Sequence, residues 1–237
     1  MSAHGTSPAI IFTGRFGSGK TEVALNYARA ISGTSLPATA PGSAPSGDSV
    51  VVIDLDIVTP YFRSRETAER MGALGIEVVA PSIIGQHLDT PAITPQLLGA
   101  IERPDRRVVL DVGGDRQGAR ALGQFSAALS RRGYIMHFVV NPFRPFTATV
   151  EGLRSSVAEI EESARLKVTS LVSNPNLMHE TTREQVVAGH AAVEAFAAEV
   201  DLPIAFVCLA ERWAEELGPM FGQPVLALAR YFAQPWE

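Results

Sequence analysis

The stretch that decides the fold lies near the amino terminus, at residues 14–21. It reads Gly14-Arg15-Phe16-Gly17-Ser18-Gly19-Lys20-Thr21 and matches G-x-x-x-x-G-K-[ST] at every fixed position. The glycines let the backbone curl so that several N–H groups point at one anion, and a helix that begins near Gly19 adds the positive end of its dipole. In this pattern Lys20 reaches the β- and γ-phosphates and the Thr21 hydroxyl binds Mg²⁺. The stretch therefore predicts a loop that binds the phosphates of a nucleoside triphosphate.

The residues on either side of this loop support the prediction. An apolar run at residues 9–12 leads into it, and residues 22–29 have the pattern of a helix that leaves it. Strand, loop and helix in this order are the context that the motif requires. A glycine-rich turn with an exposed lysine is the alternative, and these flanks disfavour it.

Length and composition favour one α/β domain over residues 1–237. The chain is 46% hydrophobic, which is enough for one sizeable core. Its net charge of −5 argues against an extended basic surface, so we expect no nucleic-acid partner. Without a run of 18 apolar residues or a signal-peptide pattern, we expect a cytoplasmic protein that does not bind a membrane.

The only cysteine, Cys208, lies in an apolar run and is expected to behave as a small buried hydrophobe. A single cysteine excludes a disulfide within the chain and a site built from several thiolates of one chain.

Apolar runs alternate with helical patterns along the chain. Strands are predicted at residues 50–53, 76–80, 107–111, 134–141, 167–173 and 204–209, and helices at 62–73, up to 101, 118–131, from 150, and 182–200. Residues 32–49 form a low-complexity stretch, which we interpret as a flexible surface loop. The pattern predicts a doubly wound, largely parallel sheet with helices on both faces, and ligands bind such sheets at the carboxyl ends of the strands.

Two further strand ends carry carboxylates. Asp111 ends an apolar strand and Gly114 follows three residues later, an arrangement in which the carboxylate can hold Mg²⁺ and the Gly114 amide can sense the γ-phosphate. Asp54 and Asp56 end another strand and can point the same way if the backbone stays extended. These two carboxylates could flank Mg²⁺ or the attacking water, and a solvated acidic turn is the alternative.

Together these motifs resemble the MinD/ParA/CobQ-like (SIMIBI) branch of the P-loop NTPases, and residues 54–66 resemble a segment of uncharacterised bacterial ATP-binding proteins. The resemblance implies that Asp56 orients the attacking water, that Asp54 and Asp111 lie in the two switches, and that Asn174 contacts the base. In that branch, a lysine at the second loop position crosses a homodimer interface to the partner's nucleotide. This sequence has Arg15 there, which leaves open whether two subunits enclose ATP in the same way.

Other residues are weaker candidates. Arg63, Arg65, Arg116 and Arg120 could stabilise phosphate charge, and Arg144 could meet nucleotide or a partner, although surface arginines are usually only solvated. Residues 224–237 carry too little positive charge for a membrane-binding helix and are predicted to form a terminal helix packed on the core.

The sequence thus favours a Mg²⁺-dependent ATPase that binds ATP, forms a homodimer and acts as a conformational switch on an unidentified protein partner. An ATP-dependent phosphotransferase or ligase, with its acceptor near residues 82–90, is one alternative. A nucleotide-bound regulatory subunit without turnover is the other. The sequence does not decide between ATP and GTP.

Overall fold

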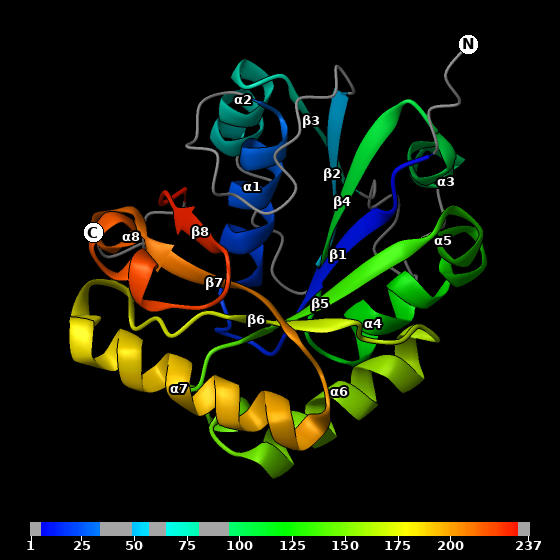
Figure 1. Cartoon of the computed structure of the whole chain (residues 1–237). Helices are drawn as coiled ribbons and strands as arrows, with labels where there is room; N and C mark the ends of the chain where they lie inside the picture. Colours follow the sequence, from blue (N-terminus) through cyan, green and yellow to red (C-terminus); the bar gives the residue numbers. More distant parts are fainter. Residues whose placement is uncertain (1–5, 34–48, 57–64, 81–94, 232–237) are drawn as a thin grey trace.

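The computed structural model describes residues 6–33, 49–56, 65–80 and 95–231. Within these residues one parallel sheet has eight strands in the order β3-β2-β4-β1-β5-β6-β7-β8 (Figure 1). The strands are β1 Ala9–Thr13, β2 Ser49–Leu55, β3 Ile76–Val79, β4 Arg106–Val112, β5 Tyr134–Val140, β6 Ser170–Ser173, β7 Ile204–Ala210 and β8 Val225–Leu228. The predicted α/β class with a parallel sheet is confirmed.

Helices cover both faces of the sheet (Figure 1). Helices α1 and α2 pack on one face, and α3 to α7 pack on the other. Their bounds are α1 Lys20–Ile31, α2 Arg65–Ala73, α3 Pro95–Glu102, α4 Arg116–Gly123, α5 Ser126–Arg132, α6 Val150–Ala164, α7 Arg183–Val200 and α8 Glu211–Leu217. In the part of the chain that the structure describes, every helix is too short or too polar to cross a membrane.

Strand β1 shows why the strands are apolar at every position. Ile11 faces the core beneath α3 to α7, whereas Phe12 faces the core beneath α1, and both side chains are fully buried. Because both faces of the sheet are covered, alternation with polar residues would place polar groups inside a core. Burying one such side chain stabilises the fold by about 1.5–3 kcal/mol.

One of the predicted helices is wrong in detail. The helix predicted at residues 118–131 is two helices, α4 and α5, because the chain turns at Gln124 and inserts Phe125 into the core. Helix α4 also begins earlier, at Arg116, since the Asp115 side chain accepts a hydrogen bond from the Gly118 N–H and caps it.

The predicted terminal helix is also wrong for the part that the structure describes. Val225–Leu228 forms strand β8, which pairs in parallel with β7 from Val207↔Val225 to Ala210↔Leu228. A short apolar run can extend a sheet edge or form a helix, and here the unpaired edge of β7 decides in favour of the strand.

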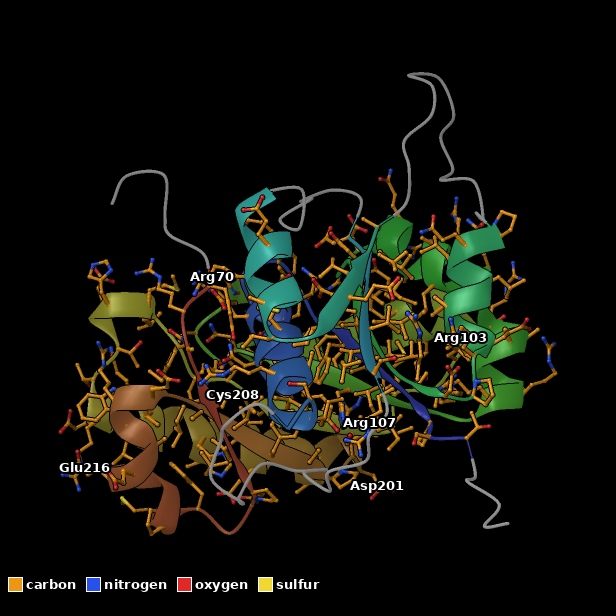
Figure 2. The ribbon with its side chains drawn as sticks, turned by 90° about the horizontal axis from the view of Figure 1, so that it is seen from above. Arg70, Arg103, Arg107, Asp201, Cys208 and Glu216 are labelled. Atoms are coloured by element: carbon orange, nitrogen blue, oxygen red, sulfur yellow. The ribbon has the colours of Figure 1, made fainter. Side chains whose placement is uncertain are left out.

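Side chains from the sheet also fix the helices around it. The Arg107 guanidinium of β4 donates to the Ile31 carbonyl at the carboxyl end of α1 (Figure 2). The Cys208 side chain of β7 is buried in the core beneath the same helix. Burial raises the pKa of the Cys208 thiol well above its ordinary value. Cys208 is therefore a packing residue, as predicted.

Candidate phosphate-binding site

The loop at residues 14–21 joins β1 to α1, as predicted. Gly17 and Gly19 have φ angles of 76° and 83°, which other residues rarely adopt. Gly19 is the N-cap of α1 and has no side-chain cap, so the first amide N–H groups of this helix remain available to an anion. The local geometry is that of a phosphate-binding loop.

Side chains from two neighbouring strand ends hold the carbonyl groups of this loop. The Asn174 Nδ2 donates to the Ser18 carbonyl at 2.7 Å. The Arg144 Nε and the Asn141 Nδ2 donate to the Gly17 carbonyl at 3.1 and 3.4 Å. Because C=O and N–H point in opposite directions across a trans peptide, these contacts keep the loop carbonyls away from the concave side. The loop is therefore preorganised by residues after β5 and β6.

Asn174 has a hydrogen-bond partner in the phosphate loop that was not predicted. Its Nδ2 binds the loop at Ser18, whereas its Oδ1 is buried without a hydrogen-bond partner among the described residues. The Asn174 Oδ1 could accept a hydrogen bond from a base, and this contact stays a prediction. The amide contact makes Asn174 a support for the phosphate loop.

Replacing Asn174 with alanine should weaken binding of Mg²⁺-ADP about tenfold, because the buried Ser18 carbonyl loses its donor. Leaving such a group unpaired costs about 1–3 kcal/mol, and about 1.4 kcal/mol corresponds to tenfold in affinity. Isothermal titration calorimetry measures the change. Asn174→Asp should weaken binding of Mg²⁺-ADP further, since a carboxylate would then face the Ser18 carbonyl. Equal affinity in the wild type and both variants would contradict this role of Asn174.

Three carboxylates gather beside the loop. Asp54 of β2 and Asp111 of β4 are paired in the sheet register, and Asp56 follows at the end of β2. The Asp56 N–H donates to the Asp54 Oδ1 at 2.9 Å, and the Lys20 Nζ lies 2.9 Å from the Asp56 Oδ2. All four side chains are buried. The motifs predicted separately therefore meet in one acidic site.

Burial makes this site favour a cation. Burial and, less strongly, the charge of Asp111 together raise the pKa of Asp54 to about 7, against a hydrogen bond from the Asp56 backbone that lowers it. Burial raises the pKa of Asp111 to about 6, opposed by the charge of Lys20 and by the Thr21 hydroxyl. Both oxygens of Asp111 are buried, and the Thr21 hydroxyl lies beside this carboxylate.

These residues fit Mg²⁺. Asp111 offers buried carboxylate oxygens, and Thr21 lies next to it at the start of α1. The described residues hold no group of three or more His, Cys, Asp or Glu arranged as metal ligands. Mg²⁺ at phosphate sites usually takes only one or two protein ligands and completes its shell with phosphates and water.

Replacing Asp54 with asparagine should stabilise the nucleotide-free protein increasingly as the pH rises. The unfolded carboxyl ionises near its ordinary pKa of 3.8 and the folded one near 7, so the folded state binds the extra proton between these values. The stability that this proton provides is complete below about pH 4 and is lost as the pH rises through 7. The substituted amide keeps the Oδ1 acceptor but does not titrate.

The gain in unfolding free energy over wild type should grow by about 2–3 kcal/mol between pH 5 and pH 8, measured by urea unfolding without Mg²⁺. Buried His137, whose pKa is lowered to about 4 by desolvation, titrates in both proteins and cancels in the difference. A gain that is the same at both pH values would show that Asp54 does not titrate as described.

Comparison with known proteins bears on the fold. No family model and no curated protein matches the chain. Among solved structures, chloroplast FtsY from Physcomitrella patens is 17% identical, with a TM-score of 0.54 over 85% of this chain and 58% of its own. Cell division protein FtsY from Thermotoga maritima is 19% identical, with a TM-score of 0.52 over 86% and 63%. The chain has the fold of a P-loop NTPase.

This likeness to P-loop NTPases extends to the signal recognition particle receptor FtsY from Elizabethkingia anophelis in complex with GDP, at 16% identity and a TM-score of 0.50 over 86% of this chain and 58% of that one. The chain spans about three fifths of the length of these neighbours. At such identities the likeness shows the fold, and it does not single out the MinD/ParA/CobQ-like branch.

Within this P-loop NTPase fold, some of the remaining predicted residues lie in the described part of the chain and others lie outside it. Phe16 is 73% exposed at the tip of the loop, and Gly114 lies against the loop backbone. The Arg15 side chain does not extend into solvent but contacts α6. Arg116 also forms an ion pair with α6, at Glu159. The side chains of Arg63 and Arg65, residues 82–90, and residues 34–48 of the predicted surface loop lie outside the described part.

Two supporting residues were missed from the sequence, Asn141 and Glu159. Asn141 follows the last residue of β5, a position at which polar side chains approach a bound ligand in parallel sheets, so a signal was present. Glu159 lies in the middle of an amphipathic helix, and its sequence position gives no indication that it pairs with the phosphate loop.

Proposed function

We propose that this chain binds a nucleoside triphosphate with Mg²⁺, hydrolyses it slowly and acts as a nucleotide-driven switch. One observation carries the proposal: a loop of phosphate-binding geometry, with its Lys20 buried, faces three carboxylates at the ends of β2 and β4. A buried group of three acids and one lysine is costly unless a cation joins it.

Each residue of this group has a distinct task in the proposed reaction. Lys20, which is paired with Asp56, would also bind the phosphates, and so would the amide N–H groups of the first turn of α1. Thr21 and Asp111, together with Asp54, would hold Mg²⁺, and the ion would neutralise charge on the phosphates. Asp56 would orient the attacking water, and Gly114 would report whether a γ-phosphate is present.

ATP is the proposed nucleotide and a second copy of the chain the proposed partner. The unpartnered Oδ1 of Asn174 suits an amino group such as that of adenine. Phe16 in the phosphate loop and Phe146, whose ring contacts the Arg15 guanidinium, are 73% and 57% exposed, and exposed apolar side chains favour an interface. A further protein partner is part of the proposal, as for other switches.

Calorimetry with ATP, GTP and ADP in the presence of Mg²⁺, followed by phosphate release at increasing protein concentration, tests this function. We expect binding of ATP and ADP, preference for ATP over GTP, and slow release that rises with concentration if a dimer is the active form. Failure to retain any purine di- or triphosphate would refute the proposal. Binding without hydrolysis would reduce it to a nucleotide-bound regulatory protein.

A further inference from the structure

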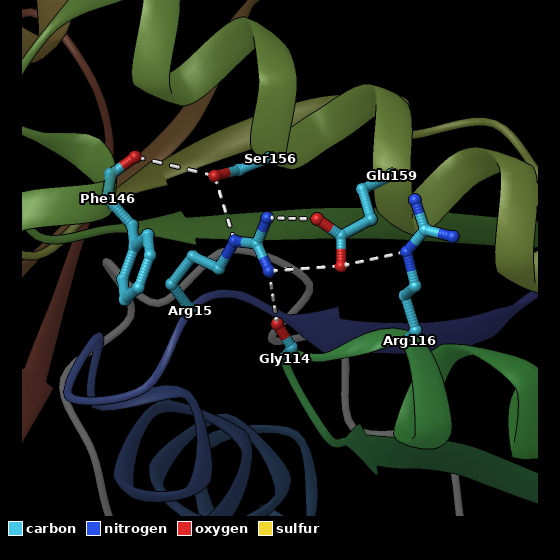
Figure 3. A network of polar contacts seen from close by, with 6 residues as sticks. All are labelled: Arg15, Gly114, Arg116, Phe146, Ser156 and Glu159. Carbon is cyan, nitrogen blue, oxygen red and sulfur yellow. Dashed lines mark hydrogen bonds and ion pairs between the residues drawn. The ribbon is translucent and has the colours of Figure 1, made fainter.

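The Arg15 side chain is held inside its own subunit by several contacts (Figure 3). Its Nε donates to the Ser156 Oγ at 2.9 Å. Its Nη2 and Nη1 donate to the Glu159 carboxylate at 2.6 and 3.4 Å. Its guanidinium carbon lies 5.4 Å from the centre of the Phe146 ring. The arginine is thus fixed on helix α6 and the segment before it.

The same guanidinium reaches the loop that follows β4. Its Nη1 donates to the Gly114 carbonyl at 3.4 Å, so one side chain joins the phosphate loop, the loop after β4 and α6 (Figure 3). Arg116, at the start of α4, approaches the same Glu159 carboxylate at 3.6 Å. A movement of the loop after β4 would therefore disturb both contacts to Glu159.

The Arg15–Glu159 pair is strong for its position. The two side chains are 13% and 24% exposed, and the guanidinium engages both carboxylate oxygens, which is the favoured geometry for arginine. The hydrogen bond from Arg15 holds the pKa of Glu159 below its ordinary value. Reaching the nucleotide of another subunit would require Arg15 to leave Glu159, Ser156 and Gly114 together.

We propose that Arg15 is a positioning residue that acts within its own subunit. Through Glu159 and the Gly114 carbonyl, it fixes the loop after β4 against the phosphate loop and so sets how strongly the site prefers a triphosphate to a diphosphate. The proposal rests on the proposed nucleotide function. A diphosphate lacks the group that Gly114 would sense, so the state of this loop matters to the triphosphate alone.

Glu159→Gln tests this role, because it removes the charge that holds Arg15 and keeps the size of the side chain. Glu162→Gln, on the exposed side of the same helix, is the matched control. We expect Glu159→Gln to change the ratio of the affinities for a non-hydrolysable ATP analogue and ADP by about fivefold or more, while ADP affinity stays within about twofold. Glu162→Gln should change neither.

A double-mutant cycle shows whether the effect passes through the contact. Arg15→Ala combined with Glu159→Gln should resemble Arg15→Ala alone, since either change breaks the same link. If Glu159→Gln instead tightened binding of the ATP analogue in a way that grew with protein concentration, Arg15 would act on a partner subunit and the proposal would be wrong. A parallel change in the affinities for both nucleotides would also overturn it.

Hydrogen exchange in the nucleotide-free protein gives a readout that does not depend on the proposed function. Amides at residues 112–118 should exchange about fivefold faster in Glu159→Gln than in wild type, and Glu162→Gln should match wild type. Unchanged exchange would overturn the proposed positioning role of Arg15 even if no nucleotide bound. Faster exchange with an unchanged affinity ratio would make the contact structural only and would also overturn the proposal.

Discussion

Replacing Lys20 with alanine is expected to lower the affinity for Mg²⁺-ATP by about 10- to 100-fold. The variant loses a buried ammonium that would bind the phosphates, and it leaves Asp56 without the partner that now lies 2.9 Å from it. Charge-assisted contacts of this kind contribute about 1.5–3 kcal/mol each, and about 1.4 kcal/mol corresponds to tenfold. Calorimetry against wild type measures the loss.

The stability of this variant must be measured with its affinity. Removing one partner of a buried ion pair typically costs about 3–5 kcal/mol, although protonation of Asp54 and Asp111 reduces the cost at low pH. Thr21→Ala provides a second variant, because it removes a proposed Mg²⁺ ligand without changing the charge of the site. It should lower affinity mainly when Mg²⁺ is present. Unchanged binding in a folded Lys20→Ala protein would show that the site is assigned wrongly.

Replacing Gly114 with alanine is expected to lower the rate of ATP hydrolysis about 100-fold. A Cβ at this position would lie 1.8 Å from the Gly14 carbonyl oxygen and 2.7 Å from its carbon, whereas real Cβ contacts essentially never fall below 3.0 Å. Both atoms belong to the backbone, so the loop after β4 must move by about 1 Å, a displacement that typically costs about 100-fold when it misplaces reacting groups.

Gly99→Ala is the matched control, because Gly99 lies in α3 and an added Cβ would meet no other element of the described residues within 4 Å. It should leave hydrolysis unchanged and stabilise the fold by about 0.5–1 kcal/mol. Single-turnover phosphate release measures the rates, and thermal unfolding confirms that both variants are folded. Hydrolysis at the wild-type rate by Gly114→Ala would mean that the two loops need not touch for the reaction.

The fold and the centre of the site follow from local patterns. Apolar runs that alternate with helical patterns are enough to predict a parallel sheet, and parallel strands necessarily bring their carboxyl ends to one edge. Asp54 and Asp111 therefore meet as sheet partners although they lie on different strands. The glycines and Lys20 were visible because their chemistry requires fixed spacing.

The remaining features of the fold and the site depend on contacts that no local sequence pattern indicates. Arg15 and Glu159 are 144 positions apart, and neither residue type indicates a partner at that distance. Strand β8 forms because β7 offers an unpaired edge, and α4 ends because Phe125 fits the core. Such features are set by tertiary packing, which overrides local preference.

The support of the phosphate loop by Asn141, Arg144 and Asn174 has a consequence for binding rates. The backbone of this loop is already ordered when the chain folds, so capture of a polyphosphate requires little further loss of conformational entropy. Diffusional encounter with the ligand, and not rearrangement of the loop, should then limit the rate at which the chain binds a polyphosphate.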